Sequence, residues 1–431
     1  MADSTQSSID MLQQLTANVS RSTSYEADPS GDPLGDVANE PKLIAYYLPQ
    51  FHPIPLNDSA WGKGFTEWTN VTKALPRFIG HYQPRLPSAL GFYDLRCGEI
   101  LREQARLARR FGVHGFCFHY YWFSGQTVLD TPLNNLLESP DIDLPFCINW
   151  ANESWTRTWD GAEHSVIIKQ RYAPDDAIRF ADKITSILDD PRYIRIDGKP
   201  MVLFYRPGAA PDAGRIIETW RNRLVENGVG ECFLVMPQGF GDEDPATYGM
   251  DAACGFPPHH VGWNTHTING HLEFLDPDFT GEVHDYQDMA ARARAHYPTT
   301  YPYFPGVCPG WDNEARRPGR GTSFHGSTPA AYEDWLSHSI GMVKQMHPPG
   351  RQVVFLNAWN EWAEGAYLEP DQHYGYAYLA ATARAIRRGA RDDIQPVRAT
   401  ATRQIDPIGP VRWARIKAAR AADRLATLLR S

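Results

Sequence analysis

Short apolar runs alternate with helix-patterned segments along this chain from residue 42 to residue 388. The runs have the length and composition of strands that are buried on both faces. Strands that alternate with helices pair in parallel through right-handed crossovers. The eight runs are residues 42–48, 113–121, 144–149, 200–205, 231–236, 252–256, 303–308 and 352–356. Eight such units predict an α/β fold, a (β/α)8 TIM barrel.

A doubly wound open sheet is the alternative architecture. It would usually carry a glycine-rich phosphate loop after its first strand, where this chain has Pro49-Gln50-Phe51-His52-Pro53. A chain of 431 residues with 42% hydrophobic residues has room for one barrel-sized domain with tails. The helix-patterned segments are residues 97–111, 175–188, 213–227, 329–346 and 374–388. These observations favour the barrel.

The two ends of the chain differ from the middle. Residues 1–40 are rich in Ser, Asp, Gly and Pro, which predicts a flexible leader with a short helix near 9–15. Residues 41–390 are expected to form the catalytic domain. Residues 391–431 are expected to form a linker and an amphipathic basic helix. That helix could pack on the barrel, bind a partner or touch anionic lipid, and packing or a solvated helix is favoured over membrane contact.

Charge and cysteine usage exclude several classes. The net charge of -9 argues against a nucleic-acid-binding protein, because such proteins neutralise phosphates. The six cysteines form no CxxC pair, which leaves a zinc or redox motif unsupported. No secretory signal and no membrane span is visible in the sequence. We therefore expect a cytoplasmic protein with reduced thiols, peripheral to the inner membrane if its tail touches lipid.

Aromatic and polar residues follow almost every strand-like run at its C-terminal end. Barrel enzymes place their active sites at that face of the sheet, so these side chains are expected to converge. Glu67 and Glu153 either bind hydroxyls or act as a second acid, with loop capping or pairing to Arg157 or Arg206 as the structural alternative. The candidate substrate-binding residues are Tyr46, Tyr47, Gln50, His52, Glu67, Trp68, His119, Tyr120, Tyr121, Trp122, Asn149, Trp150, Asn152, Glu153, Trp155, Tyr205, Asn357, Trp359 and Asn360.

The eighth run ends in two carboxylates, Glu361 and Glu364, which stand beside Trp359 and Trp362. A carboxyl pair can divide acid and base work on a glycosidic bond, and indole rings stack on the C–H faces of sugars. The alternative is a polar loop whose acids face solvent. The adjacent histidines at 259–260 would point opposite ways on an extended segment, so they make no chelate. We expect neither a metal nor a cofactor.

Five motifs stand out along the chain: AYYLPQFH at 45–52, GFTEWTNV at 64–71, FHYYWF at 118–123, NWANESW at 149–155 and NAWNEWAEG at 357–365. Together they resemble the WbsX-type glycosyltransferase family of bacterial surface-polysaccharide loci, which is related to the endo-α-1,2-mannosidase glycoside hydrolases. The resemblance covers residues 42 to about 388 and implies a TIM barrel that acts on glycosidic bonds.

The resemblance also implies a mechanism. The mannosidase relatives carry Glu-Trp-x-Glu at their catalytic centre, which falls on Glu361 and Glu364. Glu364 would be the acid/base at the glycosidic oxygen. Glu361 would take the proton of the sugar 2-hydroxyl, so that O2 attacks C1 and the configuration is retained through an epoxide-like intermediate.

Several functions remain open from the sequence. A cytoplasmic location favours assembly of lipopolysaccharide or O-antigen, whereas the carboxyl pair favours hydrolysis or transglycosylation. The expected partner is an oligosaccharide or polysaccharide, lipid-linked where the enzyme serves assembly, and no nucleic acid. The alternative is a non-catalytic glycan-binding or scaffold protein of a polysaccharide assembly system.

Overall fold

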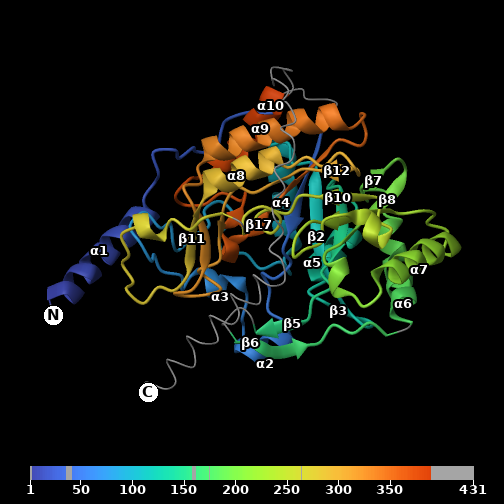
Figure 1. Ribbon diagram of the computed structural model, residues 1–431, viewed down its shortest axis with the longest axis horizontal. Coiled ribbons are helices and arrows are strands. Elements are labelled where there is room, and N and C mark those ends of the chain that lie inside the picture. Colours follow the sequence, from blue (N-terminus) through green and yellow to red (C-terminus); the bar gives the residue numbers. More distant parts are fainter. Residues whose placement is uncertain (1, 35–40, 158–161, 174, 264, 390–431) are drawn as a thin grey trace. The chain divides into compact units, whose positions relative to one another are not determined.

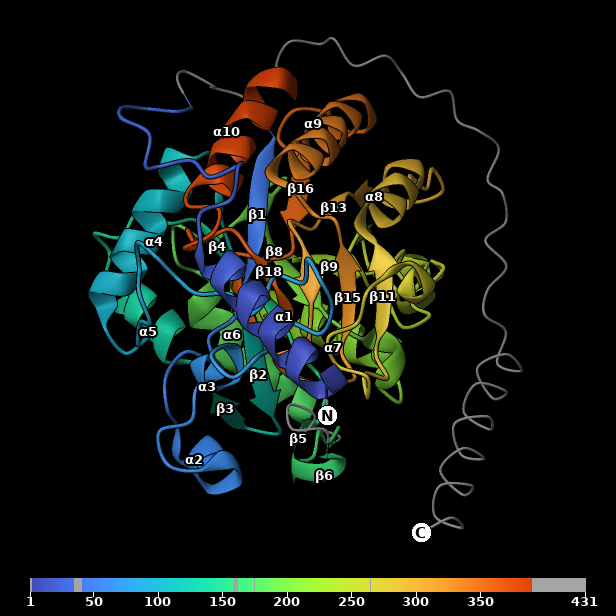
Figure 2. The ribbon, with the colours of Figure 1, turned by 90° about the vertical axis from the view of Figure 1, so that its left-hand side faces the viewer.

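Nine parallel strands form a nearly closed barrel in the computed structural model, which describes residues 2–34, 41–157, 162–173, 175–263 and 265–389 (Figures 1 and 2). The described residues belong to the first of two units, Met1–Asp393, and the predicted linker and basic helix lie outside them. The barrel strands are β1 (Lys42–Tyr47), β2 (Gly115–Phe123), β4 (Phe146–Trp150), β8 (Lys199–Phe204), β9 (Phe233–Pro237), β10 (Ala252–Cys254), β12 (Tyr303–Phe304), β13 (Gly306–Val307) and β16 (Val353–Leu356).

The seventh predicted run closes the barrel. The order of strands is β12-β10-β9-β8-β4-β2-β1-β16-β13, so β12 and β13 stand at its two ends. Only Pro305 separates them in the chain, and proline has no N–H with which to continue a ladder. The carbonyl oxygen of Pro305 instead accepts a hydrogen bond from the backbone N–H of Phe355 at 2.9 Å. Each of the eight predicted runs carries a barrel strand, which confirms the predicted TIM barrel.

Helices cover the outside of the barrel, with α9 packed along α10 and α6 along α7 (Figure 1). The five predicted helical segments correspond to α4, α6, α7, α9 and α10. The helices are α1 (Ala2–Val19), α2 (Pro55–Trp61), α3 (Glu67–Val71), α4 (Gly98–Arg110), α5 (Thr131–Glu138), α6 (Asp176–Leu188), α7 (Ala213–Glu226), α8 (Tyr286–Ala295), α9 (Pro329–Met346) and α10 (Ala377–Gly389). Among the described residues, no helix is both long enough and apolar enough to span a bilayer.

Long loops follow the first three strands at one end of the barrel. They carry α2, α3, β3 and the β5–β6 hairpin, which lie in the lower half of both views (Figures 1 and 2). The short elements outside the barrel are β3 (Gln126–Val128), β5 (Trp155–Arg157), β6 (Ala162–Ile168), β7 (Arg195–Ile196), β11 (Glu282–Asp285), β14 (Trp311–Asp312), β15 (Thr322–His325), β17 (Asn360–Glu361), β18 (Ala366–Tyr367) and the 3-10 turns η2 (Pro207–Ala209), η3 (Pro245–Tyr248), η4 (Asn269–His271) and η5 (Trp362–Glu364).

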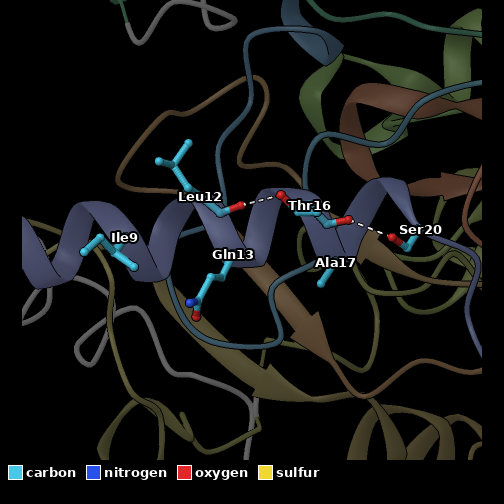
Figure 3. Close-up of a pocket in the computed structure, with 6 residues that line it drawn as sticks. All are labelled: Ile9, Leu12, Gln13, Thr16, Ala17 and Ser20. Atoms are coloured by element: carbon cyan, nitrogen blue, oxygen red, sulfur yellow. Dashed lines mark hydrogen bonds between the residues drawn. The ribbon is translucent and has the colours of Figure 1, made fainter.

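Part of the region predicted as a flexible leader contacts the barrel loops. The short helix predicted near residues 9–15 lies within the longer α1. At its end, the Asn18 side-chain amide donates to the carbonyl oxygens of His81 and Gln83, both at 2.7 Å. Further along, Arg384 of α10 pairs with Glu26 at 2.9 Å. The opposite side of α1 bears a shallow surface hollow of about 490 Å³, lined by Ile9, Leu12, Gln13, Thr16, Ala17 and Ser20 (Figure 3).

Candidate active site

Side chains along each barrel strand alternate between the interior and the surrounding helices. On β2 the His119 ring stacks on Tyr46 inside the barrel, with 5.6 Å between centroids, while the neighbouring Tyr120 meets Phe180 of α6 at 6.1 Å. The predicted residues on the inner side are Tyr46, His119, Tyr121, Asn149, Tyr205 and Asn357. Those on the helix side are Tyr47, Tyr120, Trp122 and Trp150. The second group is therefore kept away from a ligand at the barrel mouth.

Three carboxylates meet at the guanidinium group of Arg316. Its Nη2 lies 2.9 Å from Glu361 Oε2 and 3.0 Å from Glu67 Oε2, and its Nη1 lies 2.5 Å from Glu364 Oε1. Glu67 begins α3 after the first strand, Arg316 follows β14, and the other two acids follow β16. Residues from three separate loops thus build one charged cluster at the C-terminal face of the barrel.

Burial dominates the electrostatics of this cluster. It raises the pKa of Glu361 to about 8, with the charges of Glu364 and Glu67 adding to the rise and Arg316 opposing it. Burial also raises the pKa of Glu364, again against the pull of Arg316. The Arg316 guanidinium has a pKa well above its ordinary value because it faces three acids, so it stays charged. At neutral pH the pair therefore holds at least one proton, as an acid–base pair requires.

Polar side chains of the inner group surround the carboxyl cluster. Gln50 Nε2 donates to the Tyr121 hydroxyl at 2.9 Å, and the Tyr121 ring meets the edge of Trp155 at 4.8 Å. Asn149 Nδ2 lies 3.3 Å from His119 Nδ1. Burial together with Arg316 lowers the pKa of His119 to about 4, so the ring is neutral at pH 7. Gln50 Oε1 and Asn149 Oδ1 are buried and have no hydrogen-bond partner among the described residues, which leaves two acceptors for ligand hydroxyls.

The loop that carries Arg316 is held just before that residue, at Asp312 and Glu314. Asp312 accepts hydrogen bonds from His81 Nε2 at 2.8 Å and, at the same distance, from the side-chain amide of Gln83. Glu314 pairs with Arg77 through a short contact. His81, Gln83 and Arg77 all belong to the long loop after β1, which also supplies Glu67. One loop therefore provides an acid and fixes the arginine that binds it.

A buried carboxylate, Glu369, holds the two tryptophans of the Asn-Ala-Trp-Asn-Glu-Trp motif. It accepts hydrogen bonds from Trp359 Nε1 at 2.9 Å, Trp362 Nε1 at 2.7 Å, the Tyr93 hydroxyl at 2.8 Å and Gln104 Nε2 at 2.6 Å. Burial raises the pKa of Glu369 to about 7. Trp359, predicted to contact sugar, is fully buried and serves instead to position the segment before Glu361.

Other predicted residues hold the loops of the site. Asn360 binds both backbone groups of Leu48, its Oδ1 accepting at 2.7 Å and its Nδ2 donating at 3.0 Å. Asn152 binds the backbone of Arg206 in the same two-way fashion, and Glu153 is exposed and pairs with the Arg206 side chain. The ion pair with Arg206 matches the structural alternative for Glu153, in which this acid pairs with an arginine.

Two further predicted residues, Trp68 and His52, are buried beside the first loop. Trp68 Nε1 donates to the Tyr93 carbonyl oxygen at 2.8 Å, and its ring lies 5.6 Å from Trp362. Burial lowers the pKa of His52, against the opposing effect of a hydrogen bond to the backbone of Pro49. Trp68 therefore supports the catalytic segment from behind.

Sequence reasoning did not single out Arg316 or Glu369. Arg316 stands in a polar stretch beside a second arginine, Arg317, with no strand-like run to place it. Glu369 follows the motif by a few residues and looks like one more loop acid. The only available signal was the pair of indole N–H groups at Trp359 and Trp362, which need an acceptor when buried. In the described ranges, no three His, Cys, Asp or Glu side chains are grouped to hold a metal ion.

Residues 43–382 match the sequence model of the family described as Glycosyltransferase WbsX. The chain belongs to the glycosyltransferase WbsX family. Two relatives called "Uncharacterized protein WxcX", from Xanthomonas campestris pv. campestris strains B100 and ATCC 33913, are each 46% identical over 346 residues. The match covers 80% of this chain and 50% of each relative, so this WbsX-family chain spans about half the length of the curated relatives it matches.

One solved structure shows the same fold at low identity. A glycoside hydrolase-like protein aligns with TM-score 0.52 and 15% identity, over 84% of this chain and 98% of its own. The GH99 endo-alpha-mannosidase from Bacteroides thetaiotaomicron aligns with TM-score 0.49 and 17% identity, over 81% of this chain and 98% of its own. Membership of the WbsX family and the barrel fold together support a carbohydrate-active enzyme.

Proposed function

We propose that this protein makes or cleaves a glycosidic bond in bacterial surface polysaccharide metabolism, with Glu361 and Glu364 as its carboxyl pair. The observation that carries the proposal is the convergence of these two buried acids with Glu67 on Arg316, at the barrel face where such enzymes act. The family description supports chemistry on sugars. The unpaired acceptors Gln50 Oε1 and Asn149 Oδ1 supply places for substrate hydroxyls.

Each acid has a defined proton to move in this proposal. Glu364 gives its proton to the glycosidic oxygen as the bond to C1 breaks. Glu361 takes the proton of the 2-hydroxyl, and O2 bonds to C1 on the opposite face. Water or an acceptor hydroxyl then attacks C1 and gives its proton to Glu364. The C1–O2 bond breaks, and O2 regains its proton from Glu361. Two inversions at C1 leave the configuration retained.

Arg316 and Glu67 have supporting parts in this scheme. The guanidinium holds the acids close together and leaves no buried charge unpaired. Removing one partner of a buried ion pair lowers the stability by about 3–5 kcal/mol. Glu67 is fully buried and accepts hydrogen bonds from both Nε and Nη2 of Arg316, which fixes the plane of the guanidinium. Arg316 then presents its remaining edge to Glu361 and Glu364.

Product analysis tests the proposal and its direction. The protein would be incubated with α-mannosides, with nucleotide sugars and with lipid-linked acceptors, and the products followed by mass spectrometry and by the anomeric signals in NMR. A new glycosidic bond identifies a transferase, and a free reducing end with the starting configuration identifies a retaining hydrolase. Inverted product, or no product in any arm, would contradict the proposal.

One observation favours a second candidate, a glycan-binding protein without turnover. Both acids of the pair are already hydrogen-bonded to Arg316, an arrangement that also suits a static binding surface. Such a protein would bind oligosaccharide tightly, produce nothing, and bind equally well after Glu364→Gln.

A further inference from the structure

Two large aromatic side chains are exposed on the loops that follow β9 and β10. Phe240 is 49% exposed and Trp263 is 39% exposed. Both loops leave the C-terminal ends of barrel strands, the same face that carries Glu361 and Glu364. Exposed rings beside a site are the usual mark of a ligand-binding surface rather than of a core.

These rings continue a line of aromatic side chains out of the barrel. His119 meets Tyr205 at 6.3 Å between centroids, and Tyr205 meets Phe240 at 6.0 Å. Phe240 stacks on His259 at 4.9 Å, and His259 lies 5.7 Å from Trp263. We call the outer four rings, Tyr205, Phe240, His259 and Trp263, the rim strip.

The rim strip begins inside the barrel, where the Tyr205 ring meets His119 at 6.3 Å. Burial raises the pKa of Tyr205, and the charges of Glu153, Glu364 and Glu361 add to that rise. The Tyr205 ring also meets Phe256 on the inner side of the barrel at 5.4 Å. A ligand that extends outward from the barrel interior past His119 would therefore meet the strip.

The backbone is arranged to bring these rings together. Phe240 has a φ of 58°, a left-handed conformation that is uncommon for a bulky residue and concentrates at functional sites. A Cβ atom at the preceding Gly239 would come within 3.0 Å of the His259 Cβ, so the two loops approach as closely as glycine permits.

Unused polar atoms accompany the rings. His259 Nδ1, Arg206 Nε and Trp311 Nε1 are buried and have no hydrogen-bond partner in the part of the chain that the structure describes. Arg206 lies over the Phe240 ring at 4.1 Å, and Trp311 meets His259 at 5.2 Å. Apolar ring faces with a few convergent polar groups are what a sugar needs, because a pyranose has a C–H face and a rim of hydroxyls.

We propose that the rim strip is a second sugar-binding subsite, which holds the unit next to the one at Glu361 and Glu364. The substrate is then an oligosaccharide or a polysaccharide end, and its length contributes to binding. This inference rests on the proposed function for the identity of the neighbouring site.

Isothermal titration calorimetry tests the subsite by measuring the affinity for a series of α-linked manno-oligosaccharides of one to four units. Titrations use the full-length protein carrying Glu361→Gln, which prevents turnover. Phe240→Ala and Trp263→Ala are added separately. Phe92→Ala is the matched control, because Phe92 is 53% exposed and lies outside the strip.

We expect affinity to rise about tenfold from one unit to three, in line with the contribution of one or two ring contacts. Phe240→Ala and Trp263→Ala should each remove most of that rise, and Phe92→Ala should keep it. An affinity that does not change with oligosaccharide length, or a rise in affinity that survives both substitutions, overturns the subsite. The proposed function fails separately, if Glu361→Gln and Glu364→Gln leave turnover intact.

Discussion

Arg316 Nη2 lies 2.9 Å from Glu361 Oε2, which joins the loop after β14 to the loop after β16. The arginine side chain is 11% exposed and the glutamate side chain 9% exposed, so water screens the pair little. Removing one partner of such a buried pair leaves a charge without compensation. The stability and the acid–base behaviour of the site should therefore depend on this contact.

Arg316→Met should lower the free energy of unfolding by about 3–5 kcal/mol at pH 7, because three acids would then face one another without a cation. The loss should shrink at pH 5, because burial raises the pKa values of Glu361 and Glu364 and their protonation at lower pH weakens the repulsion. Urea unfolding at the two pH values measures this. Arg102→Met is the control, since Arg102 forms an exposed pair with Asp141. An equal loss in both variants would contradict the role given to Arg316.

The pH dependence of kcat/KM should report the titration of the carboxyl pair as a unit. Burial raises the pKa of Glu361 to about 8 in the free protein. The pair acts only while it holds one proton, with Glu361 ionised and Glu364 protonated, so kcat/KM should rise with pH towards about 8 and fall again once the second proton is lost. A kcat/KM that stays level from about pH 5 to pH 9 would contradict acid–base work by this pair.

Tyr121→Phe and Tyr120→Phe form a matched pair on neighbouring positions of β2. Tyr121 faces the site and its hydroxyl accepts from Gln50, whereas Tyr120 faces α6. We expect Tyr121→Phe to lower kcat/KM by about tenfold, the scale of one hydrogen bond at about 1 kcal/mol plus the freed amide. Tyr120→Phe should keep kcat/KM near the wild-type value. Equal effects of the two changes would argue against the inward orientation of Tyr121.

Glu369→Gln tests the buried support of the catalytic segment. A glutamine turns an N–H₂ group toward some of the four donors that Glu369 accepts from, which leaves buried donors unpaired at a cost of about 1–3 kcal/mol. Stability to urea and kcat should fall together. Glu103→Gln, at an exposed pair with Arg106, is the control. A variant with normal stability and normal kcat would show that Glu369 does not position the segment.

Much of the barrel could be predicted from the sequence because parallel strands that are buried on both faces leave continuous apolar runs. Even the weak run at 303–308 holds a strand, and Pro305 explains why it reads as weak. Side-chain direction was harder, since the aromatic residues at 120–122 were all assigned to the site. The period of two along β2 sends Tyr120 and Trp122 to the helices and Tyr121 inward.

The centre of the site was less predictable than its acids. Glu361 and Glu364 follow a strand with a strong pattern, whereas Arg316 lies in an irregular loop that long-range contacts of Asp312 and Glu314 hold in place. Trp359 was assigned to sugar because tryptophan is common in glycan sites. Its indole N–H is instead satisfied by Glu369, a partner that no local pattern identifies.

Turnover by Glu361→Gln and Glu364→Gln tests the central claim most directly, on whichever glycoside or donor the wild-type protein converts. The account predicts that each change lowers kcat by about two orders of magnitude or more, because each removes a proton-transfer group from the reaction. Circular dichroism and urea unfolding would confirm that both variants are folded. Folded variants that keep near-normal kcat would contradict the assignment of this carboxyl pair.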